Sequence, residues 1–282
     1  MPKIRLDLLL VERSLSDSRS LAQRLIMAGQ VRVDGQVVYK PATSVSADSK
    51  VEVDTGPRFV SRGGDKLEAA FEAWPIEVAG CVCADVGAST GGFTDCLLQH
   101  GAAKVFTIDV GKGILHWKLR SDPRVVVMEE TNARYVESLP EPVQWVVCDA
   151  SFISLKLLLP VMHRWTSLPP AGPPPLSTKW GETEGGGRGD GGEVGLITLI
   201  KPQFEAGRKE SAKGDGVIRD PDVHRRVLEE VLNFAQENGF SARGLIRSPV
   251  LGPKGNVEFL AWLGLSGESM PLEEAIQTAL AG

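Results

Sequence analysis

The stretch Ala84-Asp85-Val86-Gly87-Ala88-Ser89-Thr90-Gly91-Gly92-Phe93-Thr94 decides the fold of this chain. An apolar run, Val82 to Val86, leads into it, and a helical pattern from Phe93 to Gln99 leads out of it. A strand, a glycine-rich turn and a helix, in this order, are typical of an α/β sheet that binds a nucleotide-like ligand at the carboxyl end of its first strand. The glycines let the backbone approach such a ligand where a Cβ atom would collide.

The spacing within this turn argues against a ligand held by its phosphates. The dinucleotide fingerprint is G-x-G-x-x-G and a P-loop needs Gly-Lys-Ser/Thr, whereas this turn reads G-A-S-T-G-G and contains no lysine. An acidic residue before the turn suits S-adenosylmethionine, which carries a positive ammonium and sulfonium. A second acid ends the next apolar run, 104–108, where a ribose is typically held. The alternative is a turn that binds nothing. The candidate donor-binding residues are Asp85, Gly87, Ala88, Ser89, Thr90, Gly91, Gly92, Phe93 and Asp109.

Length and composition predict one large domain, or one large and one small. The chain has 282 residues, of which 42% are hydrophobic, enough for a substantial core. Residues 1–62 carry ten lysines and arginines against seven acidic residues, and the remainder carries 21 against 29. A basic amino-terminal module on an acidic body favours a polyanion-binding appendage, although so small an excess is also ordinary for a solvated surface.

The cysteines and the apolar runs indicate the compartment. Cys81, Cys83, Cys96 and Cys148 lie in or beside apolar runs and lack the paired C-x-x-C spacing of zinc sites. We therefore expect reduced, buried thiols in a cytoplasmic protein, and no metal centre. The first residues do not have the pattern of a signal peptide. No apolar run reaches the roughly 18–20 residues that a spanning helix needs, so we expect no membrane association.

Residues 1–56 have the pattern of a compact αβ module. Leucines from Leu6 to Leu15 mark a short helix, Ser18 can cap a second helix, and Asp34-Gly35 predicts the turn of a hairpin. The order helix, Ser-Arg, helix, Ala-Gly, V-x-V-D-G, K-P resembles the small RNA-binding fold called the S4-type domain. Basic side chains here can neutralise RNA phosphates without reading bases, or can be merely solvated. The candidate RNA contacts are Arg5, Arg19, Arg24, Lys40 and Arg62.

The rest of the chain reads as an α/β domain with one interruption. Residues 57–64, which contain a proline and a glycine pair, predict a linker, and the domain follows over 65–282. Apolar runs alternate with helical stretches over 82–150, which is a doubly wound pattern. The tract 166–194 is rich in proline, glycine and charge, and is predicted to be a low-complexity insertion.

Four charged residues lie where elements of the sheet begin or end. Lys66 starts the first helix, Asp149 and Lys201 each follow an apolar strand, and Glu258 opens the closing strand. The carboxyl ends of parallel strands meet at one edge, so Asp149 and Lys201 should face the same crevice as Gly87. Charges at the ends of buried strands are unfavourable unless they are paired. The four residues therefore predict either a catalytic cluster or a salt bridge that holds the sheet together.

Several motifs together give the chain a family resemblance over 1–165 and 195–265. They are Ser61-Arg62-Gly63-Gly64-x-Lys66-Leu67, the stretch 85–95, Asp109-Val110-Gly111, Asp149-x-Ser151-Phe152-Ile153-Ser154 and Lys201-Pro202-Gln203-Phe204-Glu205. With these motifs the chain resembles the TlyA-type proteins, in which an S4-type domain is fused to an FtsJ-like ribose methyltransferase. The chain departs from this pattern in the 166–194 tract, and in the linker it has Phe59 where some members place Trp.

The resemblance implies a fold, a reaction and a cofactor. The fold would be an S4-like module followed by a Rossmann-like class I methyltransferase domain with a mostly parallel seven-stranded sheet. The reaction would be S-adenosylmethionine-dependent 2′-O-methylation of cytidine in ribosomal RNA, with ribosomal RNA or subunits as partner and no obligate protein partner. The resemblance also implies a catalytic tetrad of Lys66, Asp149, Lys201 and Glu258. Our mechanistic hypothesis is that Lys66 makes Lys201 easier to deprotonate, Asp149 positions Lys201, and Glu258 orients Lys66 or the acceptor hydroxyl. No metal is required, because the leaving group departs neutral.

Two other classes of protein remain as alternatives. One is a non-catalytic RNA-binding ribosome-assembly factor that has kept a methyltransferase fold. The other is a membrane-active protein, because this family has carried a haemolysin label. The intact glycine turn and complete tetrad argue against the first alternative, and the lack of a spanning segment or a long basic amphipathic helix argues against the second.

Overall fold

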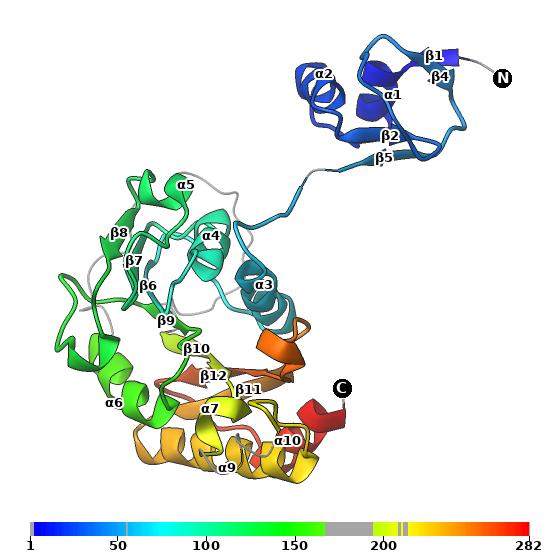
Figure 1. The fold of residues 1–282 in the computed structure, drawn as a ribbon. Helices are drawn as coiled ribbons and strands as arrows, with labels where there is room; N and C mark the ends of the chain where they lie inside the picture. Colours follow the sequence, from blue (N-terminus) through cyan, green and yellow to red (C-terminus); the bar gives the residue numbers. More distant parts are fainter. Residues whose placement is uncertain (1–2, 55, 167–193, 208–209, 211–213, 282) are drawn as a thin grey trace, which may run out of the picture. The chain divides into compact units, whose positions relative to one another are not determined.

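A computed structural model of the chain describes residues 3–54, 56–166, 194–207, 210 and 214–281. The chain divides into two compact units, Met1–Arg58 and Phe59–Gly282 (Figure 1). The predicted insertion at 166–194 falls almost entirely outside the described residues. Within the described ranges, no helix combines the length and the apolar character that crossing a bilayer demands.

The first unit is a small αβ module. Its elements are β1 (Lys3–Arg5), α1 (Leu6–Glu12), α2 (Arg19–Met27), β2 (Val31–Val33), β3 (Gln36–Val37), β4 (Ser44–Ser46) and β5 (Val51–Val53). The hydroxyl of Ser18 accepts a hydrogen bond from the Leu21 N–H and caps α2, as predicted. Asp34 and Gly35 both have positive φ and join β2 to β3 in the predicted antiparallel hairpin.

The second unit is a doubly wound α/β domain around one sheet. Its strands are β6 (Val82–Val86), β7 (Lys104–Ile108), β8 (Val125–Met128), β9 (Trp145–Cys148), β10 (Gly195–Ile200), β11 (Ser241–Arg247) and β12 (Phe259–Gly264). They lie in the order β11-β12-β10-β9-β6-β7-β8, and only β12 runs against the others. The prediction of a mostly parallel seven-stranded sheet is confirmed. The strand order reverses between β6 and β9, which is where such sheets bind ligands.

Helices cover both faces of this sheet (Figure 1). The helical elements are α3 (Gly63–Ala73), α4 (Gly92–Gln99), α5 (Trp117–Arg120), η1 (Ala133–Tyr135), α6 (Leu155–Trp165), α7 (Pro202–Glu205), α9 (Pro221–Glu237), η2 (Pro253–Gly255) and α10 (Leu272–Ala281). Side chains of α3, α4 and α5 pack on one face, and those of α6, α9 and α10 pack on the other. Successive residues of β9 alternate between the two cores, so this central strand is buried on both faces.

The start of the second unit differs from the predicted linker. The sequence predicts a linker over residues 57–64, because their Pro and Gly break both helical and strand patterns. In the structure the boundary between units follows Arg58, Phe59 is buried in the core of the second unit, and α3 begins at Gly63. A Cβ at Gly64 would lie 2.1 Å from the Phe59 ring. The glycine pair therefore serves close packing rather than chain flexibility.

The four cysteines are free thiols, in agreement with the prediction. Cys83, Cys96 and Cys148 are buried, and Cys81 is half-buried. Burial raises the pKa of the Cys148 thiol to about 12, which keeps it protonated and unreactive at neutral pH.

Candidate active site

The glycine turn follows β6 at the point where the strand order reverses. Gly87 has φ +80°, and a Cβ there would lie 2.9 Å from Cα of Ala150. The turn therefore passes directly against the backbone that follows β9, with no room for a side chain. Gly91, at φ +95°, precedes the first residue of α4, and a Cβ there would lie 2.2 Å from Leu119. Glycine at both positions is required by backbone conformation and by space.

The amino-terminal end of α3 lies against the amino-terminal end of α4. A Cβ at Gly92 would lie 2.7 Å from the backbone nitrogen of Gly64 and 2.4 Å from Oγ of Ser61. This close approach brings the segment 61–64 to the glycine turn. Lys66, the fourth residue of α3, therefore lies at the same edge of the sheet. The family motif around Gly63 and Gly64 is thus a packing motif.

Asp85 is fully buried at the end of β6 and is only partly satisfied. Oγ1 of Thr94 donates a 2.6 Å hydrogen bond to Oδ2 of Asp85, while Oδ1 has no hydrogen-bond partner among the described residues. Burial raises the pKa of the Asp85 carboxyl to about 7, although the hydrogen bond from Thr94 opposes this shift. An unpartnered carboxylate oxygen at a cavity wall fits a ligand that brings a positively charged donor.

Asp109 lies at the end of β7 and braces the glycine turn. Its Oδ2 accepts a 2.8 Å hydrogen bond from the Ser89 N–H, and its Oδ1 accepts a 2.7 Å bond from the Gly111 N–H. A carboxylate oxygen has two acceptor positions, so each oxygen can also accept a hydroxyl. The predicted ribose ligand therefore has acceptor capacity available at this position.

Two cavities open on this edge of the sheet and share a wall. One, of about 750 Å³, contacts Asp109, Thr131, Asn132 and Phe152; the other, of about 310 Å³, contacts Asp85, Lys66 and Lys201. Gly87, Ser89, Asp149 and Ser151 border both. The larger cavity has the size of a small-molecule site, and the smaller one holds the charged groups.

The four charged residues predicted at strand and helix ends come together in one cluster. Nζ of Lys66 lies 2.7 Å from Oε2 of Glu258 and 3.5 Å from Oδ2 of Asp149. Nζ of Lys201 lies 2.5 Å from Oδ1 of Asp149. Lys66, Lys201 and Glu258 are buried, and the Asp149 side chain is 20% exposed. The charges of the two ammonium groups are balanced by those of the two carboxylates. Such pairing is needed to offset the unfavourable desolvation of charged groups that are buried close together.

Lys201 is held by more than its ion pair. Its Nζ donates to Oγ of Ser151 at 3.0 Å and to the backbone oxygen of Asp149 at 3.1 Å. Asp149 contacts both lysines, so the two cations are bridged by one carboxylate. The most solvent-accessible member of the cluster is therefore the one that touches both lysines.

Three residues of this site carried no assigned role in the sequence. Nε2 of Gln203 donates a 3.0 Å hydrogen bond to Oε1 of Glu258, and a Cβ at Gly252 would lie 2.1 Å from that oxygen. Ser151, the third, binds Lys201. Gln203 and Ser151 lie within the motifs that begin at Lys201 and Asp149, so motif membership was an available signal. Gly252 belongs to none of these motifs, and no sequence signal identifies it, because it approaches Glu258 only in the folded chain.

Phe152 is a further residue of note at the larger cavity. It is 91% exposed and has φ +64°, an uncommon conformation for an aromatic residue. Its ring lies 5.0 Å from the ring of Phe204, centroid to centroid. Strained backbone that presents an apolar side chain to solvent is more frequent at binding sites than elsewhere.

The predicted RNA contacts are surface residues, and two of them are joined. The buried carboxylate of Asp7 binds Arg5 at 2.9 Å and Arg19 at 3.0 Å, and both arginine side chains remain about half exposed. The hydrogen bond from Arg5 holds the pKa of Asp7 well below its usual range, so Asp7 stays ionised. Arg24 and Lys40 are exposed in the same unit. Arg62 is exposed in the second unit and borders the smaller cavity.

Comparison with known families agrees with this architecture. A model described as FtsJ-like methyltransferase matches residues 59–265, and one described as S4 domain matches residues 4–51. The fold and the site thus define a methyltransferase of the S-adenosylmethionine-dependent class with an amino-terminal S4 module.

Individual relatives extend over nearly the whole chain. The 16S/23S rRNA (cytidine-2′-O)-methyltransferase TlyA of Mycobacterium tuberculosis is 42% identical over 286 residues, which covers 99% of this chain and 97% of TlyA. The candidate rRNA methyltransferase YqxC of Bacillus subtilis is 42% identical, covering 98% of this chain and 92% of YqxC. The chain belongs to the TlyA family.

A solved structure shows the same fold. A candidate hemolysin from Streptococcus thermophilus is 36% identical, covers 98% of this chain and 95% of its own length, and superposes with a TM-score of 0.66. The hemolysin naming expected from the family resemblance is therefore found among proteins that share this methyltransferase fold.

Proposed function

We propose that this protein transfers a methyl group from S-adenosylmethionine to the ribose 2′-hydroxyl of a cytidine in ribosomal RNA, in the cytoplasm. The observation that carries the proposal is the Lys66–Asp149–Lys201–Glu258 cluster at the smaller cavity, in which Asp149 also borders the larger one. The substrate is the one named for TlyA of Mycobacterium tuberculosis.

The residues around the glycine turn fit the methyl donor. Asp85 has a buried carboxylate oxygen without a partner among the described residues, which suits the donor's ammonium group, and Asp109 can accept the ribose hydroxyls. Because Gly87 has no side chain, its backbone itself forms part of the cavity wall. When bound, S-adenosylmethionine supplies an electrophilic methyl group on a positively charged sulfur.

The cluster supplies a base for the acceptor hydroxyl. In its uncharged form, Lys201 accepts the proton of the 2′-hydroxyl, and the ammonium that results is stabilised by Asp149 at 2.5 Å. Glu258 holds Lys66 at 2.7 Å, and Gln203 in turn orients Glu258. Positioning of the acceptor for in-line attack accounts for most of the acceleration, and the base adds roughly 10²–10⁴-fold.

Replacing the proposed base separates catalysis from donor binding. Lys201→Ala should lower the methylation rate by about 10²-fold or more, because the proton has no acceptor, while the donor Kd changes little. Single-turnover methyl transfer and calorimetric donor titration give the two quantities. Lys156→Ala, which removes a surface lysine paired with Glu230, is the matched control and should behave as wild type. Near-normal turnover by Lys201→Ala contradicts the assignment of the base.

The S4 module is proposed to hold the RNA by its phosphates. Asp7 binds both Arg5 and Arg19, and about half of each arginine side chain is exposed. Two adjacent, pre-oriented guanidinium groups bind phosphate with less loss of side-chain freedom than two independent ones. Arg24, Lys40 and Arg62 are proposed as additional contacts. We infer ribosomal RNA or a ribosomal subunit as the partner, and no obligate protein partner.

A further inference from the structure

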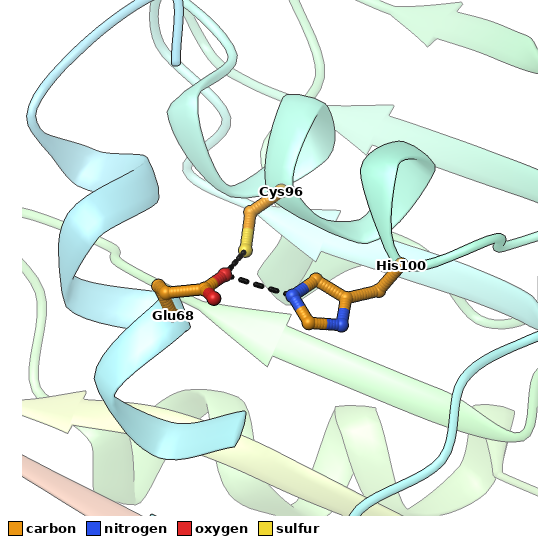
Figure 2. A group of neighbouring side chains, drawn as sticks. All are labelled: Glu68, Cys96 and His100. Carbon is orange, nitrogen blue, oxygen red and sulfur yellow. Dashed lines mark hydrogen bonds and ion pairs between the residues drawn. The ribbon is translucent and has the colours of Figure 1, made fainter. Parts of the chain in front are cut away.

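A second group of chemically reactive side chains lies between α3 and α4, outside the methyltransferase cluster. Glu68 on α3 points toward Cys96 and His100 of α4 and its carboxyl-terminal cap (Figure 2). Nε2 of His100 lies 2.8 Å from Oε2 of Glu68, and Sγ of Cys96 lies 3.6 Å from the same oxygen. The sulfur, nitrogen and oxygen atoms all lie within 4.8 Å of one another.

The distances from the Glu68 oxygen to the other two atoms are near those between ligands of one metal ion, and the Cys96 sulfur and His100 nitrogen, which lie within 4.8 Å of each other, would draw together on binding. With Zn–S near 2.3 Å and Zn–N and Zn–O near 2.0–2.1 Å, the ligand atoms of a tetrahedral site lie roughly 3.3–3.6 Å apart. The Cys96–Glu68 distance already has this value. The Glu68–His100 distance must open by about half an ångström, which small side-chain rotations supply.

The surroundings of the group are also those of a built site. Cys96 and His100 are four residues apart and therefore lie on the same face of α4. The ring of Phe71, on the next turn of α3 after Glu68, packs against the His100 ring in a tilted arrangement, 4.3 Å between centroids. Cys96 is buried, and the His100 side chain is 31% exposed, so the group reaches the surface at His100. Water can complete a fourth coordination position there.

We propose that Glu68, Cys96 and His100 bind a divalent transition-metal ion of the zinc type. Binding deprotonates the Cys96 thiol, the proton passes to solvent, and the ion gains a thiolate, an imidazole nitrogen and a carboxylate oxygen. The ion ties α3 to α4. Because Lys66 lies two residues before Glu68, and α4 begins at the glycine turn, the ion holds the catalytic lysine in register with the donor-binding turn. The cysteine spacing C-x-x-C that usually identifies zinc in a sequence is absent, so the sequence alone predicts no metal centre.

Cobalt is the direct probe, because Co²⁺ replaces Zn²⁺ and reports its ligands in its absorption spectrum. Full-length protein freed of metal with a chelator should take up one equivalent of Co²⁺ and show a thiolate-to-cobalt charge-transfer band in the near ultraviolet. Zn²⁺ should abolish the band by displacement and should raise the melting temperature. Wild-type protein that gives no band and no thermal shift overturns the proposal.

Variants assign the ligands. Cys96→Ser should lose the charge-transfer band, and His100→Asn, at a partly exposed position, should weaken Co²⁺ affinity by about tenfold or more while keeping the circular dichroism spectrum and donor binding of the wild type. Cys81→Ser removes the half-buried thiol of the same unit and should leave the band unchanged. A band that survives in Cys96→Ser, or one that disappears in Cys81→Ser, places the ion elsewhere and contradicts the assignment. Because His100→Asn tests the site without touching the buried thiol, unfolding of the serine variant does not prevent a decision.

Discussion

Asp85 is the residue on which donor binding is expected to depend most strongly through pH. Its burial at the end of β6 raises the pKa of its carboxyl to about 7, so this group is neutral below that pH and ionised above it. A cationic donor prefers the ionised form. Donor affinity should therefore fall as the pH is lowered through about 7, approaching a tenfold loss for each further pH unit.

Calorimetric titration of the donor between pH 5.5 and 8.5, a range of roughly one and a half units either side of the shifted pKa, measures this dependence. Asp85→Asn carries no titratable group and should bind weakly with a flat profile. A wild-type profile that is equally flat would show that another group holds the ammonium. In the donor-free protein, the stability of the fold depends on pH in the opposite direction from donor affinity. The contribution of Asp85 to the free energy of unfolding is complete below about pH 4 and is lost as the pH rises through about 7.

The turn between β6 and α4 needs glycine both for its positive φ and for lack of space. Comparing Gly87 with Gly113, which has a positive φ but open space around it, separates the two requirements. Gly87→Ala should destabilise the protein by roughly 2–4 kcal/mol and weaken donor binding, because the new Cβ would meet the Ala150 backbone at 2.9 Å in addition to the strain of φ +80°. Gly113→Ala has a similar φ of +69° but open space around it, and should lose only about 1 kcal/mol. Urea denaturation and donor titration compare the pair; equal losses would mean that conformation alone explains both.

The elements that position the site are largely predictable, because each has a recognisable pattern in its own stretch of sequence. Apolar runs that end in Asp85, Asp149 or Lys201 place charges at the carboxyl edge of a parallel sheet, whatever the details of packing. The glycine pair at 63–64 misled the prediction, since a glycine that allows two helices to touch has the same local pattern as a glycine in a linker. The Glu68–Cys96–His100 group could not be predicted from the sequence for a related reason. Glu68 and His100 are 32 residues apart and come into contact only when α3 packs on α4.

At the scale of the whole molecule, the two units should contribute separable functions. Replacing Arg5 and Arg19 together with Gln should weaken RNA binding and reduce the slope of log affinity against log salt by about two, because two phosphate contacts are lost. Donor affinity should not change. Filter binding across a salt series measures the slope.

Arg32→Gln serves as the matched control for that pair, since Arg32 is an exposed arginine of the same module whose guanidinium lies 3.4 Å from the Gly35 backbone oxygen. It should leave the slope close to that of the wild type. An unchanged slope in the Arg5 and Arg19 double variant would mean that RNA is held by other basic groups, and a loss of donor binding would mean that the variant has damaged the fold.

The ion pair between Lys66 and Glu258 joins positions 192 residues apart, and this sets the order of events during synthesis. While the nascent chain is being extended, Lys66 and α3 are translated well before Glu258, which directly precedes β12. β12 must then insert between β10 and β11, both of which precede it along the chain. The catalytic cluster is therefore completed only after β12 has been translated and inserted, so the chain cannot carry out the proposed reaction before that stage of its synthesis.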